Sequence, residues 1–107
     1  MEKPFVIIES PFAGEVDENI KYARECVRDS ILRGEVPFAS HLLYTQEGIL
    51  DDDIPHERDL GIDLGLQMGR IAAITAVYTD RGISRGMEYG IQRAEADGRP
   101  VEYRTIK

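Results

Sequence analysis

Short apolar segments alternate with longer amphipathic ones along this chain, and that alternation limits the possible folds more than any other feature. Four apolar segments are expected to form strands: residues 4–10, 36–40, 72–78 and 100–104. The segments between them are expected to form helices at about residues 17–33, 53–70 and 84–96, because their apolar residues recur at three- and four-residue spacing. This βαβαβαβ order predicts a parallel sheet with right-handed crossovers.

The expected fold class is therefore α/β, a small Rossmann-like three-layer sandwich with about four parallel strands and helices on both faces. No internal repeat or linker is visible, so residues 1–107 are expected to form a single domain. Residues 41–53 fit no clean period and are interpreted as a long connection, a feature that is often functional in a compact domain.

The second expected helix carries an unusual pattern of glycines. Asp53 followed by Pro55 marks its start, because an aspartate caps free amides and proline suits the first turn. Gly61, Gly65 and Gly69 then form a stripe at four-residue spacing. Each glycine destabilises a helix by roughly 1 kcal/mol relative to alanine, so close approach of another helix or of the sheet is expected to offset them. If that helix belongs to a second copy of the chain, the stripe is a dimer face.

The balance of charges argues against several classes of partner. The chain has 13 Lys and Arg against 20 Asp and Glu, a net charge of −7, and such a surface repels nucleic-acid backbones and anionic membranes. The longest apolar stretch, residues 71–78, is far shorter than the ~20 residues that cross a bilayer. No secretory signal pattern is visible, and the single cysteine, Cys26, fits a reducing compartment. We therefore expect a cytoplasmic protein that binds neither a nucleic-acid polymer nor a membrane.

Ligands of such sheets bind beyond the carboxyl ends of the strands, where residues 9–14, 41–44 and 80–88 are expected to converge. The last segment is the most informative, because Gly82 and Gly86 let the backbone approach a ligand and Ser84 can cap the helix that follows. Glu88 would lie about one turn into that helix, with its carboxylate toward the ligand. An ordinary strand–turn–helix with a solvent-facing glutamate fits the same residues.

Two short motifs resemble those of nucleoside 2-deoxyribosyltransferases. The segment Gly86-Met-Glu-Tyr-Gly90, which follows an apolar strand and an aspartate, is similar to the segment that carries their nucleophile. Ile8-Glu-Ser-Pro-Phe12 is similar to the opening strand and turn of the same superfamily. The whole chain most resembles the short, uncharacterised bacterial and phage members, which carry segments similar to residues 37–44, 48–53 and 80–87.

The resemblance implies a reaction in which a glutamate attacks the anomeric carbon, and a second base or water then resolves the deoxyribosyl-enzyme. Glu88 matches the nucleophile. Gly82 stands where a helper aspartate is usual, so Asp80, two residues earlier, is the implied hydrogen-bonding or acid–base partner. Asp63 falls near the place of another sugar-binding aspartate. The implied ligand shell comprises Ser10, Pro11, Phe12, His41, Tyr44, Gly82, Ser84, Gly86 and Met87.

Several of these residues also allow other interpretations. His41 either contacts a base or phosphate or is merely hydrogen-bonded, and Tyr44 either stacks on a nucleobase or is buried in the core or an interface. The acidic run at residues 51–53, with His56 and Glu57, suggests a divalent-cation site, but helix capping and solvation explain it as well. We expect neither a metal nor a cofactor.

Two functions follow from the sequence. As an enzyme, the protein would act at the N-glycosidic bond of a nucleoside or nucleotide, as a hydrolase or a deoxyribosyltransferase. As a binding protein, it would hold a nucleotide-derived metabolite or signal without turnover, as a sensor or a sequestering protein. Because small transferases of this type complete each pocket with a neighbouring subunit, the resemblance also implies a homo-oligomer, a dimer or larger.

Overall fold

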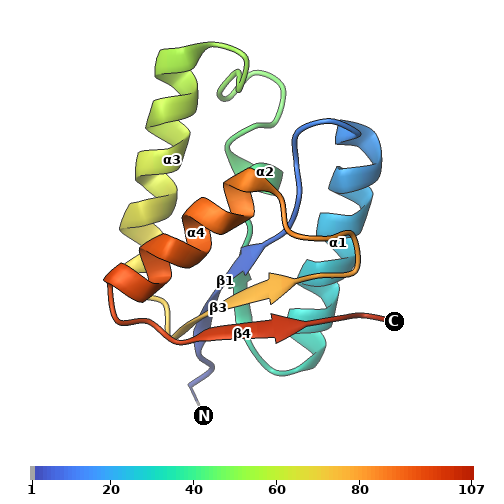
Figure 1. Ribbon diagram of the computed structural model, residues 1–107, viewed down its shortest axis with the longest axis vertical. Helices are drawn as coiled ribbons and strands as arrows, with labels where there is room; N and C mark the ends of the chain where they lie inside the picture. Colours follow the sequence, from blue (N-terminus) through green and yellow to red (C-terminus); the bar gives the residue numbers. More distant parts are fainter. Residues whose placement is uncertain (1) are drawn as a thin grey trace.

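The computed structural model describes residues 2–107, which contain a four-stranded parallel sheet. The strand order is β2-β1-β3-β4, so the first strand of the chain lies inside the sheet (Figure 1). The strands are β1 (Phe5–Glu9), β2 (Val36–Phe38), β3 (Ile74–Tyr78) and β4 (Val101–Arg104). The expected four-stranded parallel sheet is confirmed.

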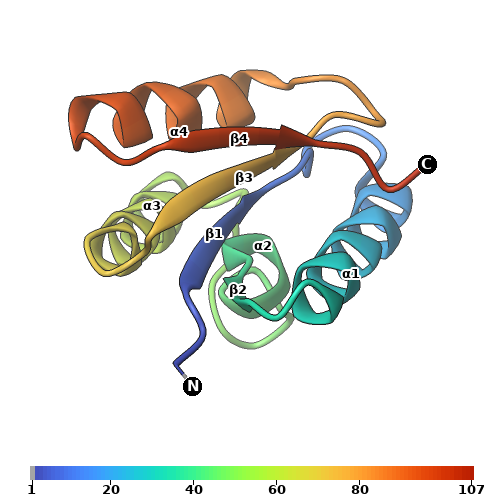
Figure 2. The same cartoon turned by 90° about the horizontal axis from the view of Figure 1, so that it is seen from below.

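The helices cover both faces of this sheet, as expected. They are α1 (Val16–Leu32), α2 (Ser40–Leu43), α3 (Pro55–Gly69) and α4 (Arg85–Ala96). Figure 2 shows α1 on one side of the sheet and α3 with α4 on the other. The result is the three-layer α/β sandwich that the alternation of segments predicts. In the part of the chain that the structure describes, no helix combines the length and apolarity needed to span a bilayer.

Two local expectations were wrong. The connection at residues 41–53 is not wholly irregular, because α2 occupies its beginning and the amide of Tyr44 donates to the carbonyl of Ser40 at 2.8 Å. The capping residue of α3 is Ile54, not Asp53, and its side chain makes no capping bond. The backbone amide of Asp53 instead donates to the side chain of Asp51 at 2.9 Å, so this aspartate belongs to a turn before the helix.

Alternate side chains of the central strands form two separate apolar clusters, as the pleat requires. Val6 and Ile8 of β1 pack on the α1 side of the sheet with Tyr22 and Cys26. On the opposite side, Val77 of β3 packs with two residues of α4, Met87 and Ile91. Glu9, two residues after Ile7, therefore shares the face of the sheet opposite to Val6 and Ile8.

The glycine stripe of α3 packs within the chain. A Cβ atom on Gly61 would stand 3.5 Å from Leu50, one on Gly65 would stand 3.9 Å from Ser40, and one on Gly69 would press on the Arg99 guanidinium. Close approach within the same chain therefore accounts for Gly69, whereas Gly61 and Gly65 stand at ordinary contact distances from their neighbours. The apolar stripe of α3 stays uncovered, since Leu60 is 50% exposed and Leu64 is 39% exposed.

Candidate functional site at the carboxyl edge of the sheet

The turn after β1 and the helix after β2 meet at the carboxyl edge of the sheet. Ser10 and Pro11 are buried in this turn. The ring of Phe12 then stacks on the imidazole of His41 in α2, with the ring centroids 4.5 Å apart and the planes 10° from parallel. The topology thus brings together two of the three segments that the sequence places at this edge.

The imidazole of His41 lacks one of its hydrogen bonds. Its Nδ1 atom is buried and has no partner among residues 2–107. Burial lowers the pKa of His41, and the negative charge of Asp52 only partly offsets this effect. The ring is therefore neutral at pH 7, and its free nitrogen offers one hydrogen bond to a ligand.

Two cavities lie beside this pair of rings. The larger cavity, of about 490 Å³, lies between the turn at residues 12–16 and residues 45–57. Its lining includes no Lys or Arg but has five acidic residues: Glu47, Asp51, Asp52, Asp53 and Glu57. The smaller, of about 50 Å³, is lined by His41 and Tyr44 among others. Glu88 lines neither cavity.

The turn before α4 has the glycine conformation and the serine cap that the sequence predicts. Gly82 has a positive φ of 84°, a conformation that favours glycine. Ser84 caps α4, because its Oγ accepts a hydrogen bond from the amide of Met87 at 3.3 Å. Met87 is buried against the sheet, whereas Gly86 and Glu88 are exposed in the first turn of the helix.

The carboxylate of Asp80 is occupied by bonds within the protein. It accepts a 2.6 Å hydrogen bond from the hydroxyl of Tyr22 in α1 and a 3.1 Å hydrogen bond from the amide of Ile106. Burial alone would raise the pKa of Asp80, but these donors outweigh it and hold the pKa below its ordinary value. Asp80 thus joins the end of β3 to α1 and to the segment after β4.

The residue at this edge that the sequence analysis did not single out is Glu9. Its side chain is partly buried and lies against Gly90 of α4, where a Cβ atom would overlap the carboxylate. Burial raises the pKa of Glu9 to about 8, although the charge of Arg99 opposes the shift. In the sequence Glu9 looks like the polar end of an apolar strand, and its contact with Gly90 joins distant positions, so no local signal marks it.

The remaining candidate residues lie in α3 and in the segment between β2 and α3. Tyr44 lies beside Phe38, with ring centroids 5.9 Å apart, and Asp63 is exposed on α3. The acidic run is engaged in the turn before α3, where the amide of Asp51 donates to Glu57 at 2.9 Å. Within residues 2–107, no three His, Cys, Asp or Glu side chains are grouped so as to hold a metal ion.

Comparisons with known proteins identify a family and similar solved structures. A family model described as "Domain of unknown function (DUF7768)" matches residues 4–104. No curated protein matches the sequence. A 2-deoxyribosyltransferase from Bacillus psychrosaccharolyticus, described as a biocatalyst for the synthesis of antiviral and antitumoral nucleosides, has a similar structure with a TM-score of 0.64. The two sequences are 19% identical, and the match covers 94% of this chain and 72% of that one. The similarity confirms the Rossmann-like fold.

Proposed function

This chain belongs to the family described as a domain of unknown function (DUF7768), and we propose that its site acts at the N-glycosidic bond of a nucleoside or nucleotide. The reaction is of the hydrolase or deoxyribosyltransferase type, with Glu88 as the nucleophile. The observation that carries the proposal is the Ser84 cap, which fixes Glu88, exposed and free to react, in the first turn of α4 at the ligand edge. Residues 1–107 act together as one 2-deoxyribosyltransferase-like domain.

The ligand shell is drawn from the three segments at this edge. Ser10, Pro11 and Phe12 supply the turn after β1, and the free Nδ1 of His41 supplies one hydrogen bond to the base. Gly82, Ser84, Gly86 and Met87 shape the turn beneath the sugar, and Tyr44 lines the small cavity. Asp80 acts as a hydrogen-bonding partner that fixes this turn, since its carboxylate is bound to Tyr22 and to Ile106.

The charge of the larger cavity favours a nucleoside over its 5′-monophosphate. Five acidic side chains line this cavity and no basic one does. A phosphate dianion placed there meets repulsion from several carboxylates at once, in an environment less polar than water. The uncharged sugar of a nucleoside experiences no such repulsion.

The first experiment follows the release of free base from a panel of nucleosides, deoxynucleosides and their 5′-monophosphates by chromatography. The wild type is expected to release base, faster from a nucleoside than from its monophosphate. Glu88→Ala is expected to reduce the rate at least about a thousandfold, because the step that forms the covalent intermediate is lost. Glu95→Ala, which removes an exposed glutamate from the same helix, should retain the wild-type rate.

A binding protein without turnover is the second candidate. It is favoured by the bonds that already occupy Asp80 and by the absence of Glu88 from the cavity linings. In that case no compound of the panel releases base, while at least one raises the melting temperature. Release by the wild type together with loss in Glu88→Ala would rule this candidate out.

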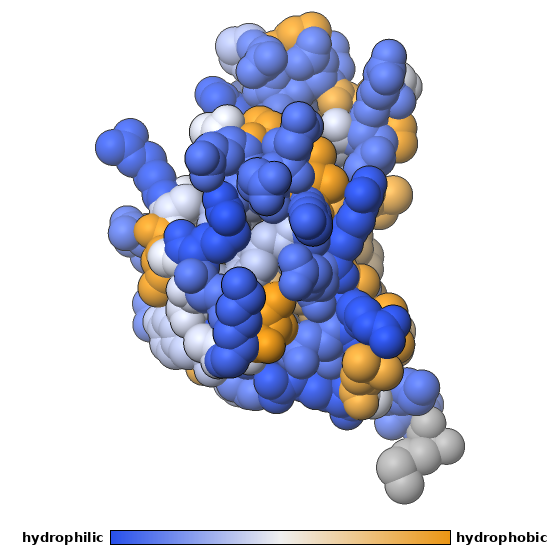
Figure 3. Space-filling model, turned by 90° about the vertical axis from the view of Figure 1, so that its right-hand side faces the viewer, coloured by the Kyte–Doolittle hydropathy of each residue, from blue (hydrophilic) through white to orange (hydrophobic). Residues whose placement is uncertain are grey.

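We also propose that the protein is a homo-oligomer and that α3 forms the interface. Leu60 and Leu64 lie one turn apart on α3 and are largely exposed. Figure 3, which shows the side of the molecule that carries α1, presents a mainly hydrophilic surface with scattered apolar side chains. Leu60 and Leu64 thus form an uncovered apolar pair on one face of α3, which a second copy of the chain would cover.

The double variant Leu60→Glu/Leu64→Glu is expected to be a monomer, because four buried charges per dimer would face one another across the interface. Light scattering at micromolar concentration measures the mass. Leu32→Glu, which changes an exposed leucine at the end of α1, is the control and should keep the wild-type mass. A monomeric wild type would contradict the proposal.

A further inference from the structure

The side chain of Asn19, in the first turn of α1, is bound by two neighbouring turns at once. Asn19 is only 4% exposed. Its Nδ2 atom donates to the carbonyl of Phe12 at 3.0 Å and to that of Ala13 at 3.3 Å. Its Oδ1 atom accepts a hydrogen bond from Nε of Arg81 at 3.0 Å. These three bonds form a link, the Asn19 link, between the turn after β1 and the turn before α4.

The first of these turns forms one wall of the larger cavity. Phe12 and Ala13, whose carbonyls Asn19 binds, both line this cavity. The ring of Phe12 also stacks on the imidazole of His41. Because β1 and β3 are neighbours in the sheet, the turns that follow them lie side by side at its carboxyl edge (Figure 1). A shift of the two carbonyls would therefore move the aromatic wall of the cavity relative to the turn before α4.

The second turn leads into the proposed nucleophile. Arg81 lies inside a tight turn, in which the amide of Gly82 donates to the carbonyl of Thr79 at 2.9 Å. Ser84, three residues after Arg81, caps α4, and the amide of Glu88 donates to the carbonyl of Ser84 at 3.0 Å. A short, hydrogen-bonded stretch of backbone thus connects Arg81 to Glu88. The position of the Arg81 side chain and the position of Glu88 are set together.

We propose that Asn19 is a positioning residue that fixes the Phe12 wall of the cavity relative to Glu88, a role that rests on the proposed function. The base and the anomeric carbon belong to one substrate, so the surfaces that bind them must keep a fixed separation. A misplacement of about 1 Å can slow a reaction about a hundredfold. A side-chain amide suits this role, because its nitrogen donates to the carbonyls while its oxygen accepts from a guanidinium. A carboxylate or an apolar side chain at position 19 cannot make both contacts.

Two variants test the Asn19 link by breaking it at opposite ends. Asn19→Asp keeps an acceptor for Arg81 but places a carboxylate oxygen against the carbonyls of Phe12 and Ala13. Arg81→Met keeps those two bonds and removes the donor at the other end. Each variant is expected to lower kcat for base release at least about tenfold and to change KM less than about threefold, because the groups that contact the substrate remain but lose their alignment.

The double variant Asn19→Asp/Arg81→Met separates one link from two independent contributions. Because either change breaks the same link, the double variant should be no slower than the slower single variant. Losses that multiply in the double variant, or a wild-type kcat in Asn19→Asp, would overturn the inference. Either result would leave the proposed function intact, because Glu88→Ala would still abolish release.

Two control variants distinguish positioning from a general loss of stability. Glu15 also binds Arg81, at 2.8 Å, but its side chain is 77% exposed, and exposed ion pairs contribute little. Ser30 is a fully buried residue near the other end of α1 that donates to Glu35 at 2.7 Å. Glu15→Gln and Ser30→Ala should both keep the wild-type kcat and KM. A loss of kcat in Ser30→Ala as large as that in Asn19→Asp would overturn the inference.

A measurement independent of activity completes the test. Nitrogen-15 NMR of the full-length protein follows the Nε–H group of Arg81, assigned by its loss in Arg81→Met. Its hydrogen is expected to exchange with solvent at least about tenfold more slowly than that of the exposed Arg85, both in the wild type and in Asn19→Asp. Equal exchange of the two arginines in the wild type would overturn the inference. Failure of the wild type to release base from any compound would overturn the proposed function and, with it, this role of Asn19.

Discussion

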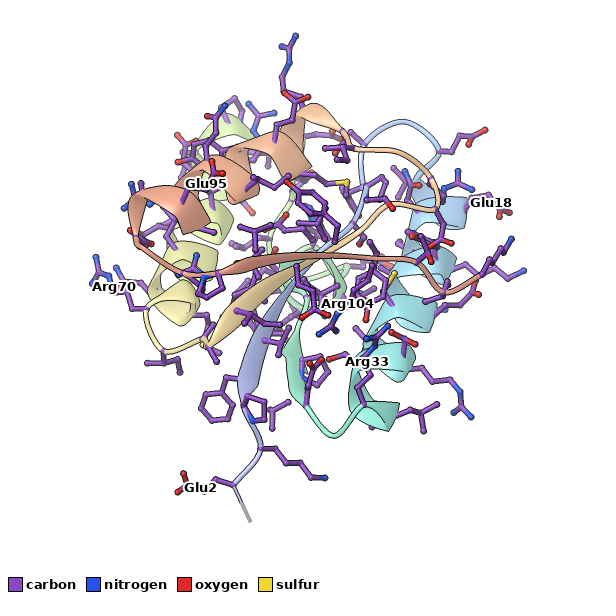
Figure 4. All side chains as sticks on the ribbon, turned by 60° about the horizontal axis from the view of Figure 1, so that its bottom comes forward. Glu2, Glu18, Arg33, Arg70, Glu95 and Arg104 are labelled. Carbon is purple, nitrogen blue, oxygen red and sulfur yellow. The ribbon has the colours of Figure 1, made fainter. Side chains whose placement is uncertain are left out.

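Glu35→Ala is expected to lower the free energy of unfolding by about 3 to 5 kcal/mol at pH 7. Glu35 accepts hydrogen bonds from both terminal nitrogens of Arg104, at 2.8 and 2.6 Å. The Arg104 side chain is only 2% exposed and that of Glu35 only 12%. Removal of the carboxylate would leave a buried guanidinium with too little opposing charge. Figure 4 shows Arg104 beside Arg33, on the α1 side of the sheet, which adds a like charge nearby.

Urea denaturation measures this loss, and Glu102→Ala is its control. Glu102 also binds Arg104, at 3.0 Å, but is 48% exposed, so its removal should lower the free energy of unfolding by less than about 1 kcal/mol. The double variant Glu35→Leu/Arg104→Met should recover much of the stability, because no buried charge remains. Equal effects of Glu35→Ala and Glu102→Ala would contradict the argument.

Glu9→Gln is expected to gain stability relative to the wild type as the pH rises. Between pH 4 and pH 9, the free energy of unfolding of the variant minus that of the wild type should increase by an amount on the order of 4 kcal/mol. Burial raises the pKa of Glu9 to about 8 in the folded protein, from an ordinary value of 4.5. Between these values the folded state holds a proton that the unfolded state has lost. Stability from Glu9 is therefore complete below pH 4.5 and disappears as the pH rises through 8.

The measurement is the free energy of unfolding of both proteins from pH 4 to pH 9. Glutamine has a similar shape and does not titrate, so the wild-type curve should fall toward pH 9 relative to that of the variant. Glu95→Gln, at an exposed position of α4 labelled in Figure 4, should follow the wild type throughout. A difference between wild type and Glu9→Gln that stays constant over this range would show that Glu9 is ionised in the folded protein at neutral pH.

The two central strands were predictable from the sequence. Residues 4–10 and 72–78 are apolar on both faces because helices cover both, and they contain β1 and β3. The start of α4 was also predictable, since Ser84 is followed by an amphipathic helix. These signals are local, so the sequence alone can reveal them.

Features that depend on distant residues were not predictable. The helix α2 has only four residues and rests against α1 and the turn after β1, so its own sequence shows no period. The bonds of Asp80 join residues 58 and 26 positions away, and nothing near Asp80 in the sequence marks them. Glu9 looks like the polar end of a strand until its contact with Gly90 is known.

The position of β1 inside the sheet has a consequence for folding. Val6 pairs with Ile74, 68 residues later in the chain, and Phe5 pairs with Val36. No strand pairs through a short local turn, so loop closure must precede most of the sheet, and such topologies fold slowly. At 5 to 20 residues per second, a ribosome takes several seconds to make the partner of β1. During that time one apolar edge of the nascent chain stays open to chaperones and to aggregation.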